Sequence, residues 1–246
     1  MKSGFVFPEW AAPANVRALF TTRIGGHSLP PYAGLNLGDH VGDDADTVAR
    51  NRMSLAEQLP ASPCWLKQVH GTRVVAASSP AGEEADASVS RSAGEVCVVM
   101  VADCLPVLFC DRSGTVVAAA HAGWRGLAAG VLDRTLQAMA CPPQDVLAWM
   151  GPAIGPEAFE VGPEVREAFL ADSPLAQQAF CAGQGDRWYA DIFALARLRL
   201  EKLGLAPAAI SGGGVSTVAD PSRFYSYRRE RVTGRMAALI WLASSR

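Results

Sequence analysis

The stretch of residues 100–126 constrains the fold of this chain more than any other part. It reads MVADCLPVLFCDRSGTVVAAAHAGWRG. Its beginning belongs to a short apolar run, 96–102, whose β-branched residues are typical of a fully buried strand. The run stops at Asp103 and Cys104, so a polar and a reactive side chain are expected at the carboxyl end of that strand.

A second apolar run, 115–120, repeats this plan and stops at His121. The polar cluster 111–114 between the two runs is typical of a turn, which predicts two neighbouring strands. The sequence AGWRG follows His121, and its two glycines permit a tight backbone before residues 127–139, whose apolar spacing predicts a helix. The thiol of Cys104 and the imidazole of His121 are therefore expected to face one pocket.

The remaining apolar segments alternate between strand-like and helix-like patterns. Further strands are expected at 15–22, 64–69, 146–150 and 236–242, and further helices at 46–59, after Gly162-Pro163 and at 190–203. This alternation predicts an α/β protein, an αβα sandwich with a mixed β-sheet. No internal repeat or low-complexity linker divides the chain, so a single domain of residues 1–246 is expected.

Charge and hydropathy argue against several classes of partner. The formal net charge of −2 gives no overall attraction to nucleic acid or to an anionic membrane, so any anion site must be local. The apolar runs fall well short of the roughly 20 residues that span a bilayer. The N-terminus lacks the basic region and apolar core of a signal peptide. We therefore expect a cytoplasmic protein, a monomer, with neither nucleic acid nor membrane as a partner.

The cysteines favour a reduced compartment rather than a disulfide framework. Six are scattered along the chain without a CxxC pair, and several lie in apolar runs where a cysteine is usually a small buried hydrophobic residue. Cys104 differs, because Asp103 precedes it and Pro106 follows it.

A third reactive side chain, His70, follows the apolar segment CWLKQV. Two histidines and one cysteine match the ligand count of a catalytic zinc site that keeps one position open. Three well-separated residues are a weak motif, and a second reading makes Cys104 a nucleophile with His121 as its base. The residues alone leave both readings open.

Motifs spread over nearly the whole chain resemble, in order, those of the YfiH family, also called the laccase-domain or polyphenol oxidoreductase family and more recently purine nucleoside phosphorylase. The matching segments are TTRIGGHSLPPYAGLNLGDHVGDD, NR, KQVHG, VADCLPVLFCD, AAAHAGWRG, GPAIGPEAFEVG and FYSYRRERVTGRMAALI. The resemblance implies an αβα sandwich and a metal bound by His70, Cys104 and His121. Zinc is the expected ion, with copper as the alternative.

The resemblance also implies an activity, the phosphorolysis of purine nucleosides such as adenosine, inosine, guanosine and methylthioadenosine, with adenosine deamination as a second reaction. Nucleoside and phosphate are then the expected partners. Phosphorolysis needs cationic groups for the phosphate, and Arg23, Arg125 and Arg228 are the arginines on loops that can supply them. Arg125 is expected in the catalytic set, and Arg23 and Arg228 in the substrate-binding set.

Two further polar residues are candidates for the site. Asp103 would orient a ligand histidine or act as a base, which places it with Cys104 in the catalytic set. Asn36 would bind a ribose hydroxyl or the purine edge. Each is equally a residue type that satisfies backbone amides in turns.

Two other functions remain as alternatives. The older family name suggests a copper-dependent oxidase of phenols, but multicopper sites use many histidines and this chain has four. A cysteine hydrolase acting on peptidoglycan precursors would need a free Cys104 thiolate, whereas a bound metal would occupy that sulfur. Metal content therefore separates the three functions.

Overall fold

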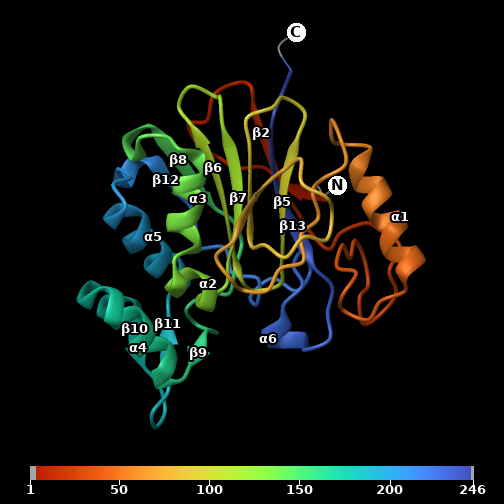
Figure 1. Ribbon diagram of the computed structural model, residues 1–246. Coiled ribbons are helices and arrows are strands. Elements are labelled where there is room, and N and C mark those ends of the chain that lie inside the picture. Colours follow the sequence, from red (N-terminus) through yellow and green to blue (C-terminus); the bar gives the residue numbers. More distant parts are fainter. Residues whose placement is uncertain (1–3, 245–246) are drawn as a thin grey trace.

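The computed structural model describes residues 4–244, and two β-sheets packed face to face form its centre (Figure 1). The antiparallel four-stranded sheet has the order β1-β2-β13-β5, with strands β1 (Phe5–Val6), β2 (Val16–Thr21), β5 (Val96–Val101) and β13 (Met236–Leu242). The mixed six-stranded sheet has the order β12-β8-β6-β7-β4-β3, with strands β3 (Val74–Ala76), β4 (Ala87–Ser90), β6 (Leu105–Asp111), β7 (Val117–Ala122), β8 (Val146–Met150) and β12 (Ile210–Gly212).

The central strand β7 is buried on both faces, which explains why its sequence VAAAHA is apolar except for His121. Side chains alternate across a strand, so Ala119 faces the four-stranded sheet and belongs to a cluster with Phe20 and Val99. Ala118 and Ala120 face the other way, toward the helices. Two large hydrophobic clusters therefore lie on the six-stranded sheet, one on each of its faces.

Helices cover the two outer faces of this pair of sheets (Figure 1). The outer face of the six-stranded sheet is covered by α2 (Trp124–Ala129), α3 (Val131–Met139) and α5 (Ile192–Lys202), and α4 (Pro163–Asp172) packs against α2. On the outer face of the four-stranded sheet, Leu55 of α1 (Ala45–Ala56) packs with Leu35 and Leu37 of the preceding loop. A small sheet and a short helix complete the fold, with β9 (Glu160–Val161), β10 (Phe180–Ala182), β11 (Trp188–Ala190) and α6 (Tyr227–Glu230).

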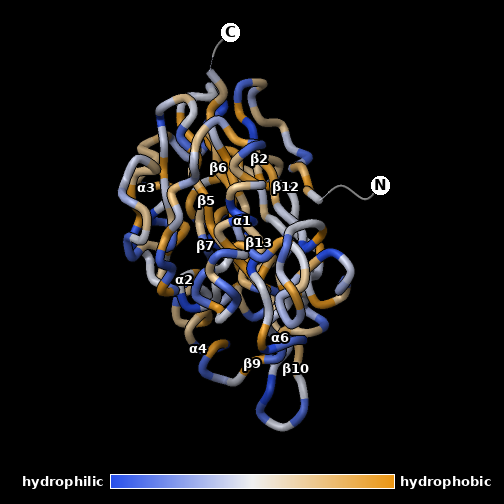
Figure 2. Tube along the Cα trace, turned by 90° about the vertical axis from the view of Figure 1, so that its right-hand side faces the viewer, coloured by the Kyte–Doolittle hydropathy of each residue, from blue (hydrophilic) through white to orange (hydrophobic). Residues whose placement is uncertain are grey.

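Hydropathy along the chain follows this arrangement. In Figure 2 the hydrophobic colour concentrates along the central strands, whereas the loops at the periphery are mostly hydrophilic. No helix within residues 4–244 combines the length and the apolar character needed to cross a membrane.

The predicted mixed α/β class is confirmed, with the finding that the middle layer of the sandwich is two stacked sheets. The apolar runs 96–102 and 115–120 lie in different sheets, because a third strand, β6, separates them and forms the hairpin with β7. The chain crosses from one sheet to the other at 102–104, where Asp103 has a φ of 86°. Cys104 therefore lies at the crossing point rather than at the end of the first strand.

The expected strand at 64–69 is wrong, because this segment forms no ladder with β5 beside it. The side chain of Gln68, rather than the backbone of the segment, forms hydrogen bonds with Met100 of β5. Its Oε1 accepts from Met100 N at 2.7 Å and its Nε2 donates to Met100 O at 2.8 Å. The expected helix 127–139 is interrupted at Gly130, whose φ of 99° separates α2 from α3.

Candidate metal and substrate site

The structure brings His70, Cys104 and His121 together, with ligand atoms that all lie within 4.8 Å of one another. Cys104 Sγ lies 3.8 Å from His70 Nε2, and the two imidazole rings meet edge to face with centroids 4.8 Å apart. His121 comes from β7, Cys104 immediately precedes β6, and the pairing of these strands sets Pro106 opposite His121. His121 is buried, Cys104 is half-buried and His70 is exposed, so the group opens to one side.

One carboxylate, Asp86, positions both histidines. Its Oδ1 lies 2.8 Å from His121 Nδ1 and accepts a hydrogen bond from the backbone N–H of His70 at 2.9 Å. Its Oδ2 accepts from the N–H groups of Val69 and Gly71 at 3.2 and 2.7 Å. These bonds hold His70 at its unusual φ of 60° and leave Nε2 of His121 directed to the neighbouring thiol and imidazole.

The electrostatics of the group favour a thiolate beside an imidazolium. Burial alone would raise the pKa of the Cys104 thiol, but the nearby imidazoles of His121 and His70 lower it to about 6. Burial would lower the pKa of His121, but Cys104 and Asp86 outweigh this effect and raise it to about 9. The thiolate is the form of cysteine that binds metal ions.

The arrangement fits a metal ion with two nitrogen ligands, one sulfur ligand and an open position. A carboxylate behind a ligand imidazole, as Asp86 stands behind His121, is the usual support in such sites. Gly123 leaves the necessary space, since a Cβ there would lie 3.0 Å from Cys104 Sγ and 2.8 Å from His70 Cδ2.

A cavity of about 450 Å³ opens beside these three side chains. Its wall combines aromatic and aliphatic residues with a few polar and cationic groups, and besides the three it includes His40, Gln68, Met100, Asp103, Trp124, Ile154, Phe159, Ile192, Tyr227, Arg228 and Arg235. Apolar walls with a small number of convergent polar groups are typical of small-molecule sites.

A family model described as multi-copper polyphenol oxidoreductase laccase matches residues 17–243. The chain belongs to this family. Purine nucleoside phosphorylase YfiH of Escherichia coli is 54% identical over 244 residues, which cover 98% of this chain and 99% of the relative. Purine nucleoside phosphorylase PA4543 of Pseudomonas aeruginosa is also 54% identical, over 241 residues and with the same coverage. The resemblance to the YfiH family is therefore confirmed.

Two solved structures share the fold of this chain. The crystal structure of Neisseria meningitidis protein NMB0706 has a TM-score of 0.95 at 50% identity and covers 98% of this chain and 100% of its own. YlmD from Geobacillus stearothermophilus has a TM-score of 0.88 at 30% identity and covers 99% of this chain and 98% of its own.

In this laccase-family chain, Asp103 contributes to the cavity wall, but its carboxylate is bonded to the segment that follows β12. Oδ1 accepts from Thr217 Oγ1 at 2.6 Å, and Oδ2 accepts from Ser226 Oγ at 3.0 Å and from Arg228 N at 2.6 Å. None of these partners is a ligand histidine. The geometry therefore makes Asp103 an anchor for the first turn of α6, next to Cys104 in sequence.

Arg228 also lines the cavity, as the sequence predicts for a substrate-binding residue. Both terminal nitrogens of its guanidinium already have partners, because Nη1 donates to Ala158 O at 2.7 Å and Nη2 to Glu160 O at 3.1 Å. Arg228 therefore ties α6 to the segment that carries Phe159, another residue of the cavity wall.

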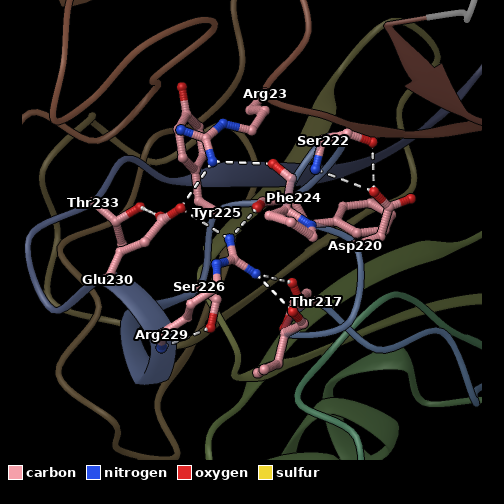
Figure 3. Close-up of polar contacts among 12 residues, drawn as sticks. Arg23, Thr217, Asp220, Ser222, Phe224, Tyr225, Ser226, Arg229, Glu230 and Thr233 are labelled. Atoms are coloured by element: carbon pink, nitrogen blue, oxygen red, sulfur yellow. Dashed lines mark hydrogen bonds and ion pairs between the residues drawn. The ribbon is translucent and has the colours of Figure 1, made fainter.

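Arg23 lies outside the cavity lining and belongs to a network that fixes the 216–235 segment (Figure 3). Its Nη1 lies 2.9 Å from Glu230 Oε1 and donates to Pro221 O at 3.2 Å, and its guanidinium stacks 4.6 Å from the Tyr225 ring centroid. Arg229 contacts the same Glu230 oxygen at 3.0 Å. It also donates to the carbonyls of Thr217, Val218 and Phe224.

Asn36 and Arg125 are not in the cavity lining either. Asn36 is fully buried, and its Oδ1 accepts from Gly38 N at 2.9 Å and from Arg235 N at 2.8 Å. Arg125 is exposed and stacks over the neighbouring Trp124 ring at 4.5 Å. Five residues besides the three predicted metal ligands were expected at the site, and two of them, Asp103 and Arg228, reach the cavity wall. Arg125 and Arg228 were expected on loops, but they lie in α2 and α6.

Sequence reasoning missed Asp86 and Arg235. Each stands at the start of a strand, Asp86 directly before β4 and Arg235 directly before β13. The expectation that a metal-binding histidine has a carboxylate behind it could have drawn attention to Asp86. Arg235 gives no such signal, because its part in the site depends on the long-range pairing that brings β13 next to β5.

Proposed function

We propose that this protein is a metal-dependent purine nucleoside phosphorylase that works in the cavity beside His70, Cys104 and His121. The observation that carries the proposal is the convergence of this metal-binding group on a cavity with aromatic and cationic walls. The near-full-length similarity to proteins named purine nucleoside phosphorylase supports the same activity.

The reaction would join a phosphate oxygen to the ribose C1′ while the bond from C1′ to the purine nitrogen breaks. The bonding electrons leave with the purine, which takes up a proton, and the products are ribose 1-phosphate and the free base. Positive charge develops at the sugar as the base departs, so a fixed anion beside it lowers the barrier. The site must therefore hold a flat apolar base and an oxyanion at the same time.

The cavity wall offers groups for both tasks. Trp124, Phe159 and Tyr227 present aromatic surface against which a purine can stack. Arg228 and Arg235 are the arginines in the wall and supply positive charge. When bound, a metal ion at the histidine and cysteine group would supply a Lewis acid.

We propose zinc as that ion, because one thiolate and two imidazoles are ligands that zinc favours. Adenosine deamination belongs to the same proposal as a second activity of the metal site. Copper is less suited to the proposed role, since the described residues offer one group for a metal ion whereas multicopper oxidation needs several.

A cysteine-dependent hydrolase is the second candidate, and the lowered pKa of Cys104 favours it. A thiolate 3.8 Å from an imidazole nitrogen is a nucleophile with a base beside it. The two functions differ in their need for metal and phosphate, which makes them separable in one assay.

The test is to incubate the protein with inosine or adenosine, with and without inorganic phosphate, and to separate the products by chromatography. We expect free purine and ribose 1-phosphate only when phosphate is present, with any conversion of adenosine to inosine unaffected by phosphate. Purine release at the same rate without phosphate would identify a hydrolase. No turnover of any purine nucleoside by metal-loaded protein would refute the proposal.

A further inference from the structure

The two arginines of the cavity wall, Arg228 and Arg235, differ in how many of their guanidinium nitrogens donate a hydrogen bond. In Arg228, both terminal nitrogens donate to backbone carbonyls of the 158–160 segment. In Arg235, Nη1 alone is engaged, and it donates to Thr233 O at 3.0 Å and to Gly234 O at 3.1 Å. Within residues 4–244, Nε and Nη2 of Arg235 donate no hydrogen bond, and no carboxylate forms an ion pair with this guanidinium.

The backbone around Arg235 is fixed from both sides. Its N–H donates to Oδ1 of the buried Asn36 at 2.8 Å, and its carbonyl accepts from Leu37 N at 3.1 Å. The same Asn36 oxygen accepts from Gly38 N at 2.9 Å, so one amide holds the strand and the loop together. Asn36 and Leu37 therefore fix the backbone position from which the Arg235 side chain extends, and neither residue lines the cavity.

The stem of Arg235 passes over Gly38. A Cβ at position 38 would lie 2.7 Å from Cγ and 3.1 Å from Cβ of Arg235, which is closer than side chains pack. His40, two residues further along this loop, lies in the cavity wall with Arg235. The loop is thus shaped to let a cationic side chain reach the cavity.

An arginine in this position is costly without an anion. Burial lowers the pKa of Arg235, and the negative charges of Cys104 and Asp103 offset only part of this effect. The Asp103 carboxylate is already bonded to Thr217, Ser226 and a backbone amide, so it does not pair with Arg235. The Nε and Nη2 donors lie on one edge of the guanidinium, an edge that matches two oxygens of a tetrahedral oxyanion.

We propose that Arg235 binds the phosphate co-substrate through Nε and Nη2, with His40 beside it in the same subsite. This inference rests on the proposed function for the identity of the anion. Arg235 then takes the role that the sequence predicted for Arg23 and Arg125, which lie outside the cavity lining. Asn36 is then a positioning residue that places Arg235 rather than a direct contact with substrate.

The experiment compares wild type with Arg235→Gln, Arg235→Lys and His40→Gln, and uses Arg112→Gln as a control at an exposed turn. The Michaelis constant for phosphate is measured at saturating inosine, and the constant for inosine at saturating phosphate. Loss of a charge-assisted contact should raise the phosphate constant about 10- to 150-fold in Arg235→Gln and leave the inosine constant within about threefold. Arg235→Lys, which keeps the charge but loses the planar edge, should fall between, and Arg112→Gln should equal wild type.

Calorimetric titration of each purified protein with inorganic phosphate alone, with thermal unfolding as a check on folding, separates this inference from the proposed function. Phosphate binding that weakens in Arg235→Gln and Arg235→Lys sustains the inference even if no nucleoside is turned over. Unchanged phosphate binding and an unchanged phosphate constant in both folded variants would overturn it while leaving phosphorolysis intact. If Arg235→Gln does not fold, the same comparison is made on Arg235→Lys and His40→Gln.

Discussion

The carboxylate of Asp86 lies 2.8 Å from the imidazole of His121 while its two oxygens accept hydrogen bonds from three successive backbone amides that include His70. Asp86 thereby orients the ring of His121 and fixes the backbone of His70, and both histidines are proposed metal ligands. Cys104 is placed independently, by the crossing of the chain between the two sheets. The three ligand positions are thus fixed before any ion arrives, which favours tight binding.

Replacing Asp86 by asparagine should weaken metal binding by about 10- to 100-fold, because the support of His121 and the anion that the three amides require are both lost. Competition with a chelator of known affinity measures the change. Asp186→Asn is a suitable control, since Asp186 is exposed and distant in sequence from the site. Equal metal affinity in wild type and Asp86→Asn would refute the supporting role.

The protein purified without added metal should contain about one zinc ion per chain, and His121→Ala should lose most of it, because a site with three protein ligands depends on each of them. Elemental analysis of both proteins is the measurement. His27→Ala serves as the control, since His27 is exposed and outside the cluster. Full zinc retention in His121→Ala would refute the assignment of this histidine as a ligand.

Much of the fold could be predicted from local patterns. Strands at 96–102, 146–150 and 236–242 and the helix that Asp191 caps are continuous apolar or periodic segments with clear ends, and the structure has them. The strand predicted at 64–69 is wrong although its apolar residues are typical of a strand. In the structure, the Gln68 side chain forms the hydrogen bonds with the backbone of Met100 in β5. No pattern within the segment distinguishes the two outcomes.

The site was predictable where chemistry alone marks a residue. His70, Cys104 and His121 are reactive side chains at the ends of apolar runs, and the structure brings them together as expected. Arg23 was indistinguishable in sequence from a phosphate contact, since its partner Glu230 is 207 positions away. Roles set by such long-range pairing need the structure. The single domain of residues 1–246, the monomer and the cytoplasmic location stay predictions.

Asp103→Ala should destabilise the segment that carries Tyr227 and Arg228 to the cavity, because two buried hydroxyl donors and one half-buried backbone donor lose their acceptor. We expect the free energy of unfolding to fall by about 1–3 kcal/mol. The Michaelis constant for inosine should also rise, by a larger factor than the dissociation constant of the metal ion. Urea unfolding, kinetics and metal competition on the same preparation test this. A loss of metal affinity with unchanged stability would instead make Asp103 a direct partner of the metal site.

The last prediction concerns the pH dependence of the network around Glu230. Burial would raise the pKa of this carboxyl, but hydrogen bonds from Thr233, Arg229 and Arg23 outweigh it and lower the pKa. A carboxyl with a lowered pKa in the folded protein stabilises it above the unfolded value of about 4.3, and the contribution is lost as the pH falls through the folded value. Glu230→Gln should therefore cost about 1–3 kcal/mol of unfolding free energy at pH 7 and progressively less below about pH 4.

Urea unfolding of wild type and Glu230→Gln between pH 7 and pH 3 measures this difference. Glu84→Gln is the matched control, since Glu84 forms an exposed pair with Lys67 at 2.8 Å and its loss should leave the stability nearly unchanged. A Glu230→Gln penalty that stays constant across this range would show that the charge of Glu230 contributes nothing. Arg23 would then stabilise the segment through its stacking on Tyr225 and its bond to Pro221 O alone.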